Sequence, residues 1–149
     1  MSLEAIITEK MKEAMKAKDK EKLEAIRAIK NAILQEKTKA GGSDQIDEAT
    51  ELKMLQKLVK QREDSADIYK KENRPELAEK ELFEAGVIRE FLPAPLSEDE
   101  IRGQIEKIIA EIGASSMKDM GKVMGMANKA MAGRADGKLI SEIVKAKLQ

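Results

Sequence analysis

Apolar residues recur at every third or fourth position through most of this sequence, and that spacing limits the chain to helices. Side chains three and four apart share one face of an α-helix, whereas a half-buried strand needs strict alternation. Between Lys20 and Lys39 the apolar face consists of Leu23, Ile26, Ile29, Ile33 and Leu34. With one Tyr, two Phe and no Trp, the cores must be built from Leu, Ile, Met and Ala. The pattern predicts an all-α protein.

Helix boundaries follow from capping residues and helix breakers. The spacing predicts seven helices, at roughly 3–16, 20–39, 47–72, 74–91, 98–112, 117–132 and 137–148. Before the fourth helix, Asn73 and Glu76 resemble a capping box, with Pro75 in the first turn. Asp136 is the expected cap of the last helix.

A proline-containing connector, FLPAPLSEDE at 91–100, separates the fourth and fifth helices. Pro93 and Pro95 cannot continue a helix, and Ser97 with Glu100 has the pattern of a capping box that begins the next one. We place a domain boundary at 92–97. The prediction is an N-terminal domain of about four long helices at 1–92, followed by a small three-helix C-terminal domain at 97–149.

The composition argues against several kinds of chemistry. The chain has no Cys and no His, which removes thiolate chemistry and the commonest general base and metal ligand. Ser115, Ser116 and Lys118 raise the idea of serine–lysine catalysis, but Ser116 is better interpreted as a helix N-cap. We therefore expect no catalytic residues, no metal site and no cofactor.

No apolar run approaches the roughly 18 residues that a membrane-spanning helix needs. The first twenty residues also lack the apolar centre of a secretory signal peptide. These two features predict a cytoplasmic protein without a membrane partner.

Charge is balanced overall, at 28 basic and 28 acidic residues, but it is unevenly distributed. Residues 113–149 hold seven basic and three acidic residues, whereas 44–96 hold nine and thirteen. On a helical wheel of 117–132, one side carries Met117, Met120, Met124, Ala127 and Met131, which predicts a core face. The other side carries Lys118, Lys122, Gly125 and Lys129, with Gly121 at its border.

Gly121 and Gly125 lie one turn apart inside this predicted helix, where each costs about 1 kcal/mol relative to Ala. Two explanations are open. The glycines could let a neighbouring helix approach closely, or they could let a phosphate backbone approach while the lysines neutralise it. Periodicity alone favours helix packing.

The following turn, GRADGK at 133–138, combines a helix-ending Gly133 with the capping Asp136. A helix N-terminus can hold an anion, but Asp136 already supplies one. Arg134 and Lys138 could still reach a phosphate beside it.

GASSMKDMGKVMG at 113–125, followed by GRADGK and preceded by FLPAPLSEDE, resembles the GatB/YqeY family over the whole chain. The resemblance implies a helical N-terminal domain and a three-helix C-terminal domain similar to the tail domain of the B subunit of tRNA-dependent amidotransferases. A similar module is appended to some glutaminyl-tRNA synthetases, and the tail helps to hold tRNA. Phe91 replaces the tyrosine expected in the connector. We expect no counterpart of the B subunit's kinase-like catalytic domain within these 149 residues.

The resulting expectation is a tRNA-binding accessory protein that contacts structured RNA through backbone phosphates. The expected nucleic-acid-binding residues are Lys118, Gly121, Lys122, Gly125, Lys129, Arg134 and Lys138. The family naming implies a first alternative, carbon–nitrogen ligase activity with glutamine as amide donor, acting on aminoacyl-tRNA within a larger assembly. A second alternative is a helical protein-interaction module. Expected partners are tRNA and an aminoacyl-tRNA synthetase or amidotransferase assembly.

Overall fold

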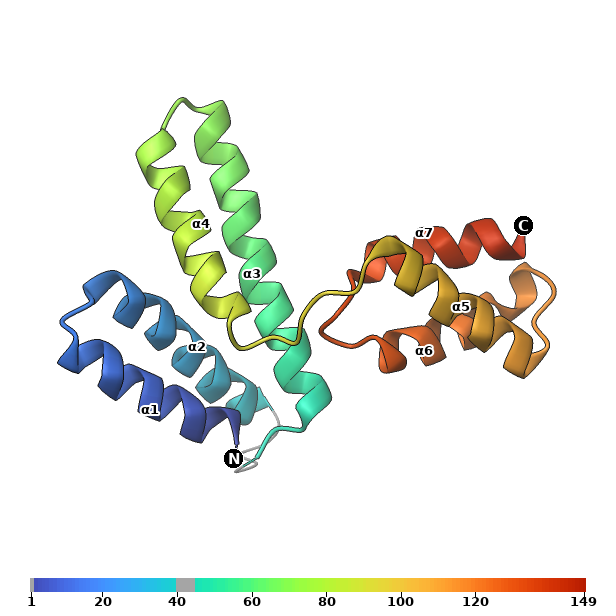
Figure 1. Cartoon of the computed structure of the whole chain (residues 1–149), viewed down its shortest axis with the longest axis horizontal. Helices are drawn as coiled ribbons and strands as arrows, with labels where there is room; N and C mark the ends of the chain where they lie inside the picture. The colour runs from blue at the N-terminus through green and yellow to red at the C-terminus, as the bar shows by residue number, and fades with distance from the viewer. Residues whose placement is uncertain (1, 40–44) are drawn as a thin grey trace. The chain divides into compact units, whose positions relative to one another are not determined.

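The computed structural model describes residues 2–39 and 45–149, and every regular element in these ranges is helical. The helices are α1 (Leu3–Lys16), α2 (Lys20–Lys39), α3 (Glu48–Lys71), α4 (Pro75–Arg89), α5 (Glu98–Ile112), α6 (Met120–Ala130) and α7 (Gly137–Leu148), with a 3-10 turn at Met117–Asp119 before α6 (Figure 1). The prediction of an all-α fold is confirmed. The chain divides into two compact units, Met1–Leu92 and Pro93–Gln149.

The N-terminal unit consists of two helical hairpins, α1 with α2 and α3 with α4, and α2 packs against α3 and α4 (Figure 1). Its core contains Ile7, Ile26, Ile29, Leu55 and Ile88, each no more than 1 % exposed. Between α3 and α4, the Nε of Arg62 lies 3.4 Å from a carboxylate oxygen of Glu84, and both side chains are largely buried. The Arg62 Nε has no hydrogen-bond partner among the described residues, so the two charges offset one another by proximity alone, and removing either one would leave the other buried and unpaired.

The end of α3 differs from the predicted pattern. Asn73, expected as a cap for α4, instead has φ +60 and ends α3, and α4 begins at Pro75 without a side-chain cap. The Asn73 N–H donates to the Lys70 carbonyl and the Arg74 N–H to the Tyr69 carbonyl. Asparagine tolerates this left-handed conformation well, which explains the difference from the predicted capping box.

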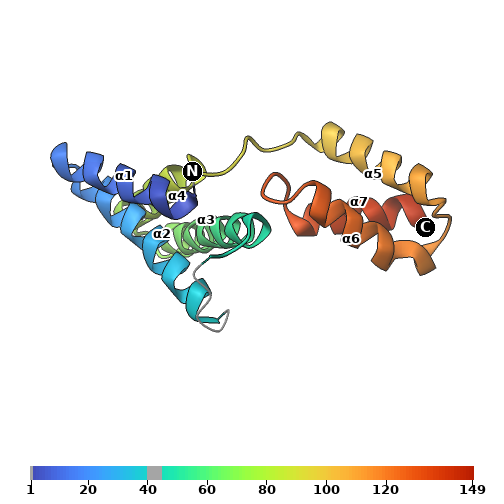
Figure 2. The same cartoon turned by 90° about the horizontal axis from the view of Figure 1, so that it is seen from below.

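The C-terminal unit packs α5, α6 and α7 around a second core (Figure 2). Ile101, Ile105, Val123, Ala127, Met131, Ile140 and Val144 are at most 1 % exposed. Met117, expected in this core, is 41 % exposed because it precedes α6 in the 3-10 turn, where the helical wheel does not apply. In the described part of the chain, no helix is long and apolar enough to cross a membrane.

Candidate nucleic-acid interface

The loop before α6 is organised by Asp119. Its Oδ2 accepts hydrogen bonds from the backbone N–H groups of Ser115, at 3.0 Å, and Ser116, at 3.4 Å. The two serines thus belong to the turn that begins the helix, as the capping interpretation expects. Lys118, in the same turn, is exposed.

The apolar side of α6 fixes which residues face outward. Val123 and Ala127 are fully buried, and Met120 and Met124 pack partly buried against the same core. Because a helix repeats every 3.6 residues, the opposite side must face solvent. That side carries the exposed residues Gly121, Lys122, Gly125 and Lys129. Together with Lys118, which is exposed in the 3-10 turn before α6, they are called the lysine–glycine face.

The two glycines of this face border open space. A Cβ built on Gly121 or Gly125 would meet no atom within 4 Å outside the adjacent helix backbone. The helix-packing explanation, favoured by periodicity, is therefore wrong for this unit, because no neighbouring helix approaches either glycine. What the glycines provide is backbone that an outside molecule can reach.

All charged side chains of α6 are positive. The helix has no Asp or Glu between Met120 and Ala130. Within the described chain, none of Lys118, Lys122 and Lys129 forms an ion pair. By contrast, Lys147 of α7 pairs with Glu106 of α5, and that hydrogen bond lowers the pKa of the Glu106 carboxyl. The lysines of the lysine–glycine face thus remain available to an external anion.

The two cations of the GRADGK turn have different surroundings. Lys138 is exposed, while its backbone N–H donates to Oδ1 of the capping Asp136 at 3.1 Å. Arg134 is half-buried: its Nε donates to the Ala94 carbonyl at 2.9 Å, and its own carbonyl accepts from the Leu96 N–H at 2.8 Å. Arg134 therefore ties the connector to the α6–α7 turn. Sequence reasoning missed this role, because residues about forty positions apart leave no local pattern.

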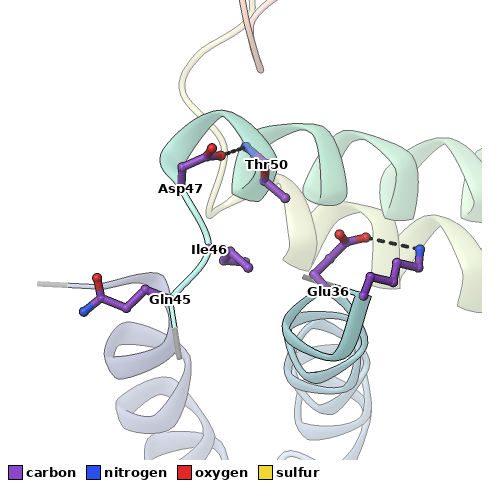
Figure 3. Close-up of a pocket in the computed structure, with 6 residues that line it drawn as sticks. Glu36, Gln45, Ile46, Asp47 and Thr50 are labelled. Carbon is purple, nitrogen blue, oxygen red and sulfur yellow. Dashed lines mark hydrogen bonds and ion pairs between the residues drawn. The ribbon is translucent and has the colours of Figure 1, made fainter. Parts of the chain in front are cut away.

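A small polar cleft of about 310 Å³ lies elsewhere, where α3 begins (Figure 3). It is lined by Glu36, Lys39, Gln45, Ile46, Asp47 and Thr50. Asp47 caps α3 by accepting from the Thr50 N–H at 2.7 Å, and Glu36 pairs with Lys39. Hydrogen bonding by the Thr50 side chain, and then by its backbone, lowers the pKa of the Asp47 carboxyl. The charged groups of this cleft thus already have partners. The described residues contain no cluster of three potential metal ligands.

The lysine–glycine face lies within a longer stretch of the sequence that matches a protein-family model. The family model described as "Yqey-like protein" matches residues 4–148. The chain belongs to the YqeY-like family. The resemblance inferred from the motifs at 113–125 and 133–138 is thereby confirmed.

Curated relatives of this YqeY-like chain fall into two groups. It is 33 % identical over 108 residues to "Altered inheritance of mitochondria protein 41, mitochondrial" of Lachancea thermotolerans, covering 71 % of this chain and 57 % of that protein. The protein of the same name from Vanderwaltozyma polyspora is 35 % identical over 116 residues, or 74 % of this chain and 62 % of that protein. The chain thus spans about three fifths of the length of these relatives.

A shorter match links the chain to an amidotransferase. It is 41 % identical over 58 residues to a subunit of the glutamyl-tRNA(Gln) amidotransferase of Thermococcus gammatolerans, which is 36 % of this chain and 9 % of that protein. This match supports the expected relation to the amidotransferase tail domain.

The names of the longer relatives require one correction. Three of the matched proteins are named as mitochondrial, which contradicts the cytoplasmic location expected from the sequence. The reasoning failed because a chain without a membrane span and without a secretory signal core is compatible with more than one compartment.

Proposed function

We propose that this YqeY-like protein is an accessory protein that binds structured RNA, with tRNA as its ligand. The observation that carries the proposal is the lysine–glycine face of α6 and the turn before it: three lysines without an ion pair to any described residue, no acidic residue in α6 and two open glycines. The name of the amidotransferase relative includes a tRNA, which agrees with this ligand. The match covers too little of that protein to carry its activity over.

The chemistry of the face favours phosphate contacts over base contacts. Lysine is a flexible point charge that neutralises phosphates and releases counterions, and it carries no sequence information. No aromatic residue follows Phe91, so the C-terminal unit offers no platform on which unpaired bases could stack. A folded RNA recognised by the shape of its backbone suits such a surface better than a single strand.

The glycines add a steric component. Without a Cβ at Gly121 and Gly125, a phosphate could approach the helix backbone more closely than over an alanine. Lys122 and Lys129 flank Gly125 by one turn on either side and supply the positive charge. Lys138 and the outer nitrogens of Arg134 extend the cationic surface into the next turn.

The test is salt-dependent binding of total tRNA to the intact protein, measured by filter binding. Changing Lys118, Lys122 and Lys129 together to Gln should weaken binding to all tRNAs alike and lower the salt slope by roughly one unit per lost phosphate contact. The matched control, called the α3 control variant, changes Lys53, Lys57 and Lys60 of α3 to Gln. It removes the same charge from exposed lysines that also lack ion pairs within the described chain.

The two variants separate a local surface from net charge. Equal losses in both would show a general charge effect and refute the assignment to α6. Absence of tRNA binding by the parent protein at low salt would refute the function itself. Glutamine-dependent amidation by the purified protein would instead support the ligase alternative.

A protein-interaction module is a second candidate, and α4 supplies an observation for it. Leu82 is 38 % and Phe83 41 % exposed, and both lie close to the open Gly86 on the same helix. If this surface docks a partner assembly, changing both side chains to Ser should abolish co-sedimentation with an amidotransferase or synthetase and leave tRNA affinity unchanged. Unaltered co-sedimentation would count against this surface.

A further inference from the structure

The turn between α1 and α2 presents a second group of free lysines. Lys12, Lys16, Lys18 and Lys20 are exposed, and none forms an ion pair with another described residue. Other lysines of the same hairpin are engaged: Lys10 with Glu13, Lys22 with Glu90, and Lys37 with Glu4. Lys16, Lys18 and Lys20 thus lie where α1 passes into α2, at one end of the hairpin drawn in Figure 1, whereas Lys30, which also forms no ion pair with a described residue, lies in the middle of α2.

Lys18 has an unusual backbone conformation for its residue type. It has φ +56, and it closes α1 with two hydrogen bonds, from its own N–H to the Met15 carbonyl and from the Asp19 N–H to the Ala14 carbonyl. This arrangement normally takes Gly, and sometimes Asn, because other side chains are strained there. The other left-handed residues in the described chain are Asn73, Gly113 and Gly133.

A strained lysine at an exposed turn is better explained by function than by folding. Glycine would close α1 with less strain, so the positive charge is the property that lysine adds at this position. Asp19, whose Oδ1 accepts from the Lys22 N–H at 3.1 Å and caps α2, and Glu21 offset part of this charge, but Lys16, Lys18 and Lys20 outnumber them. The turn therefore keeps a net positive charge, of which only a part is used at the C-terminal end of the α1 dipole.

We infer that Lys16, Lys18 and Lys20 form a second phosphate-binding surface for the same structured RNA. This inference rests on the proposed function. A membrane surface is the less suitable partner, because the apolar face of α1 is already used: Leu3, Ile7 and Ala14 lie in the core of the unit. A helix that inserts into lipid needs that face free.

Two cationic surfaces on one chain would act together. One lies in the N-terminal unit and one in the C-terminal unit, and a short connector joins the units. Once one surface holds the RNA, binding of the other becomes intramolecular, so the two together bind more tightly than either alone. Binding should therefore depend more steeply on salt than the lysines of α6 alone would produce.

The experiment measures tRNA affinity of the intact protein against salt concentration for three variants. We expect Lys16, Lys18 and Lys20 changed together to Gln to lower the salt slope by roughly two to three units. The α3 control variant, which removes the same charge, should lower it by less than about one unit. Equal slopes for these two variants, with binding still lost in the α6 triple variant, would overturn this inference and leave the proposed function standing. No binding by the parent protein would overturn both.

Lys18→Gly separates charge from folding. It should raise the melting temperature, because glycine relieves the left-handed strain, and it should weaken tRNA binding. Unchanged tRNA affinity with a raised melting temperature would contradict a phosphate contact at Lys18. A membrane role is tested with vesicles of equal parts phosphatidylcholine and phosphatidylserine. If the parent protein binds them, and the variant with Lys16, Lys18 and Lys20 changed to Gln loses this binding but keeps tRNA binding, the turn is assigned to membranes and the inference is overturned.

Discussion

Replacing the glycines of α6 by alanine should strengthen the helix and weaken RNA binding at the same time. A Cβ on Gly121 or Gly125 meets nothing within 4 Å, so Ala fits without moving any neighbour. Gly125→Ala, in the interior of α6, should therefore recover about 1 kcal/mol of helix propensity, and Gly121→Ala, in the first turn of α6, should recover less, so the double variant gains between about 1 and 2 kcal/mol. For a unit of this size, each kcal/mol corresponds to roughly 4–8 °C in melting temperature.

The effect on RNA should have the opposite sign. If a phosphate approaches the bare backbone between Lys122 and Lys129, a methyl group at Gly125 holds it away from the helix. A loss of about 1.4 kcal/mol in binding free energy would appear as a tenfold higher Kd for tRNA. Gly125→Leu should reduce binding further, because its side chain covers more of the face.

Gly103 of α5 is the matched control. It is exposed, it lies in the middle of a helix in the same unit, and a Cβ there also meets nothing within 4 Å. Gly103→Ala should give the same stabilisation of about 1 kcal/mol without changing tRNA affinity. Thermal melts followed by circular dichroism, combined with filter binding, measure both quantities.

Two results would refute the reasoning. A fall in melting temperature for Gly121→Ala or Gly125→Ala would mean that the glycines are needed for packing after all. Stabilisation with unchanged tRNA affinity, as in Gly103→Ala, would mean that no phosphate approaches the glycines.

Other predictions concern the connector and the caps. Arg134→Met removes the hydrogen bond from Arg134 Nε to the Ala94 carbonyl. It should therefore destabilise the C-terminal unit by about 1 kcal/mol and speed proteolysis of the connector, whereas Lys138→Met should do neither. In the parent protein, limited proteolysis should cut within 92–97 before it cuts α2 or α3; first cuts inside those helices would contradict a domain boundary there. Ser97→Ala should cost about 1 kcal/mol in an unfolding titration, through loss of the cap. The pKa of Glu100 is lowered from 4.5 by its hydrogen bond from the Ser97 backbone, so its stabilising contribution is complete above pH 4.5 and disappears as pH falls through the lowered pKa. Glu100→Gln should flatten that part of the pH–stability profile, and an unchanged profile would argue against the bond.

Local sequence determined the helices and several of their ends. Apolar spacing fixed the positions of α1 to α5 and α7 to within a few residues, because it depends only on the helical repeat. The caps at Ser97 and Asp136, and the turn at Ser116, depend on residues within a few positions of the chain, and so their patterns were visible. The lysine–glycine face followed from the same repeat, once the buried side of α6 was recognised.

Only the tertiary structure decided how particular residues are used. The space beside Gly121 and Gly125 depends on where other helices pass, which helical periodicity does not encode. Arg134 finds its partner at Ala94, and Arg62 finds Glu84, across long stretches of chain. Lys18 and Asn73 take left-handed conformations that their residue types alone do not dictate. Local patterns arise from contacts within one or two turns, whereas these features arise from contacts that form only when the helices pack.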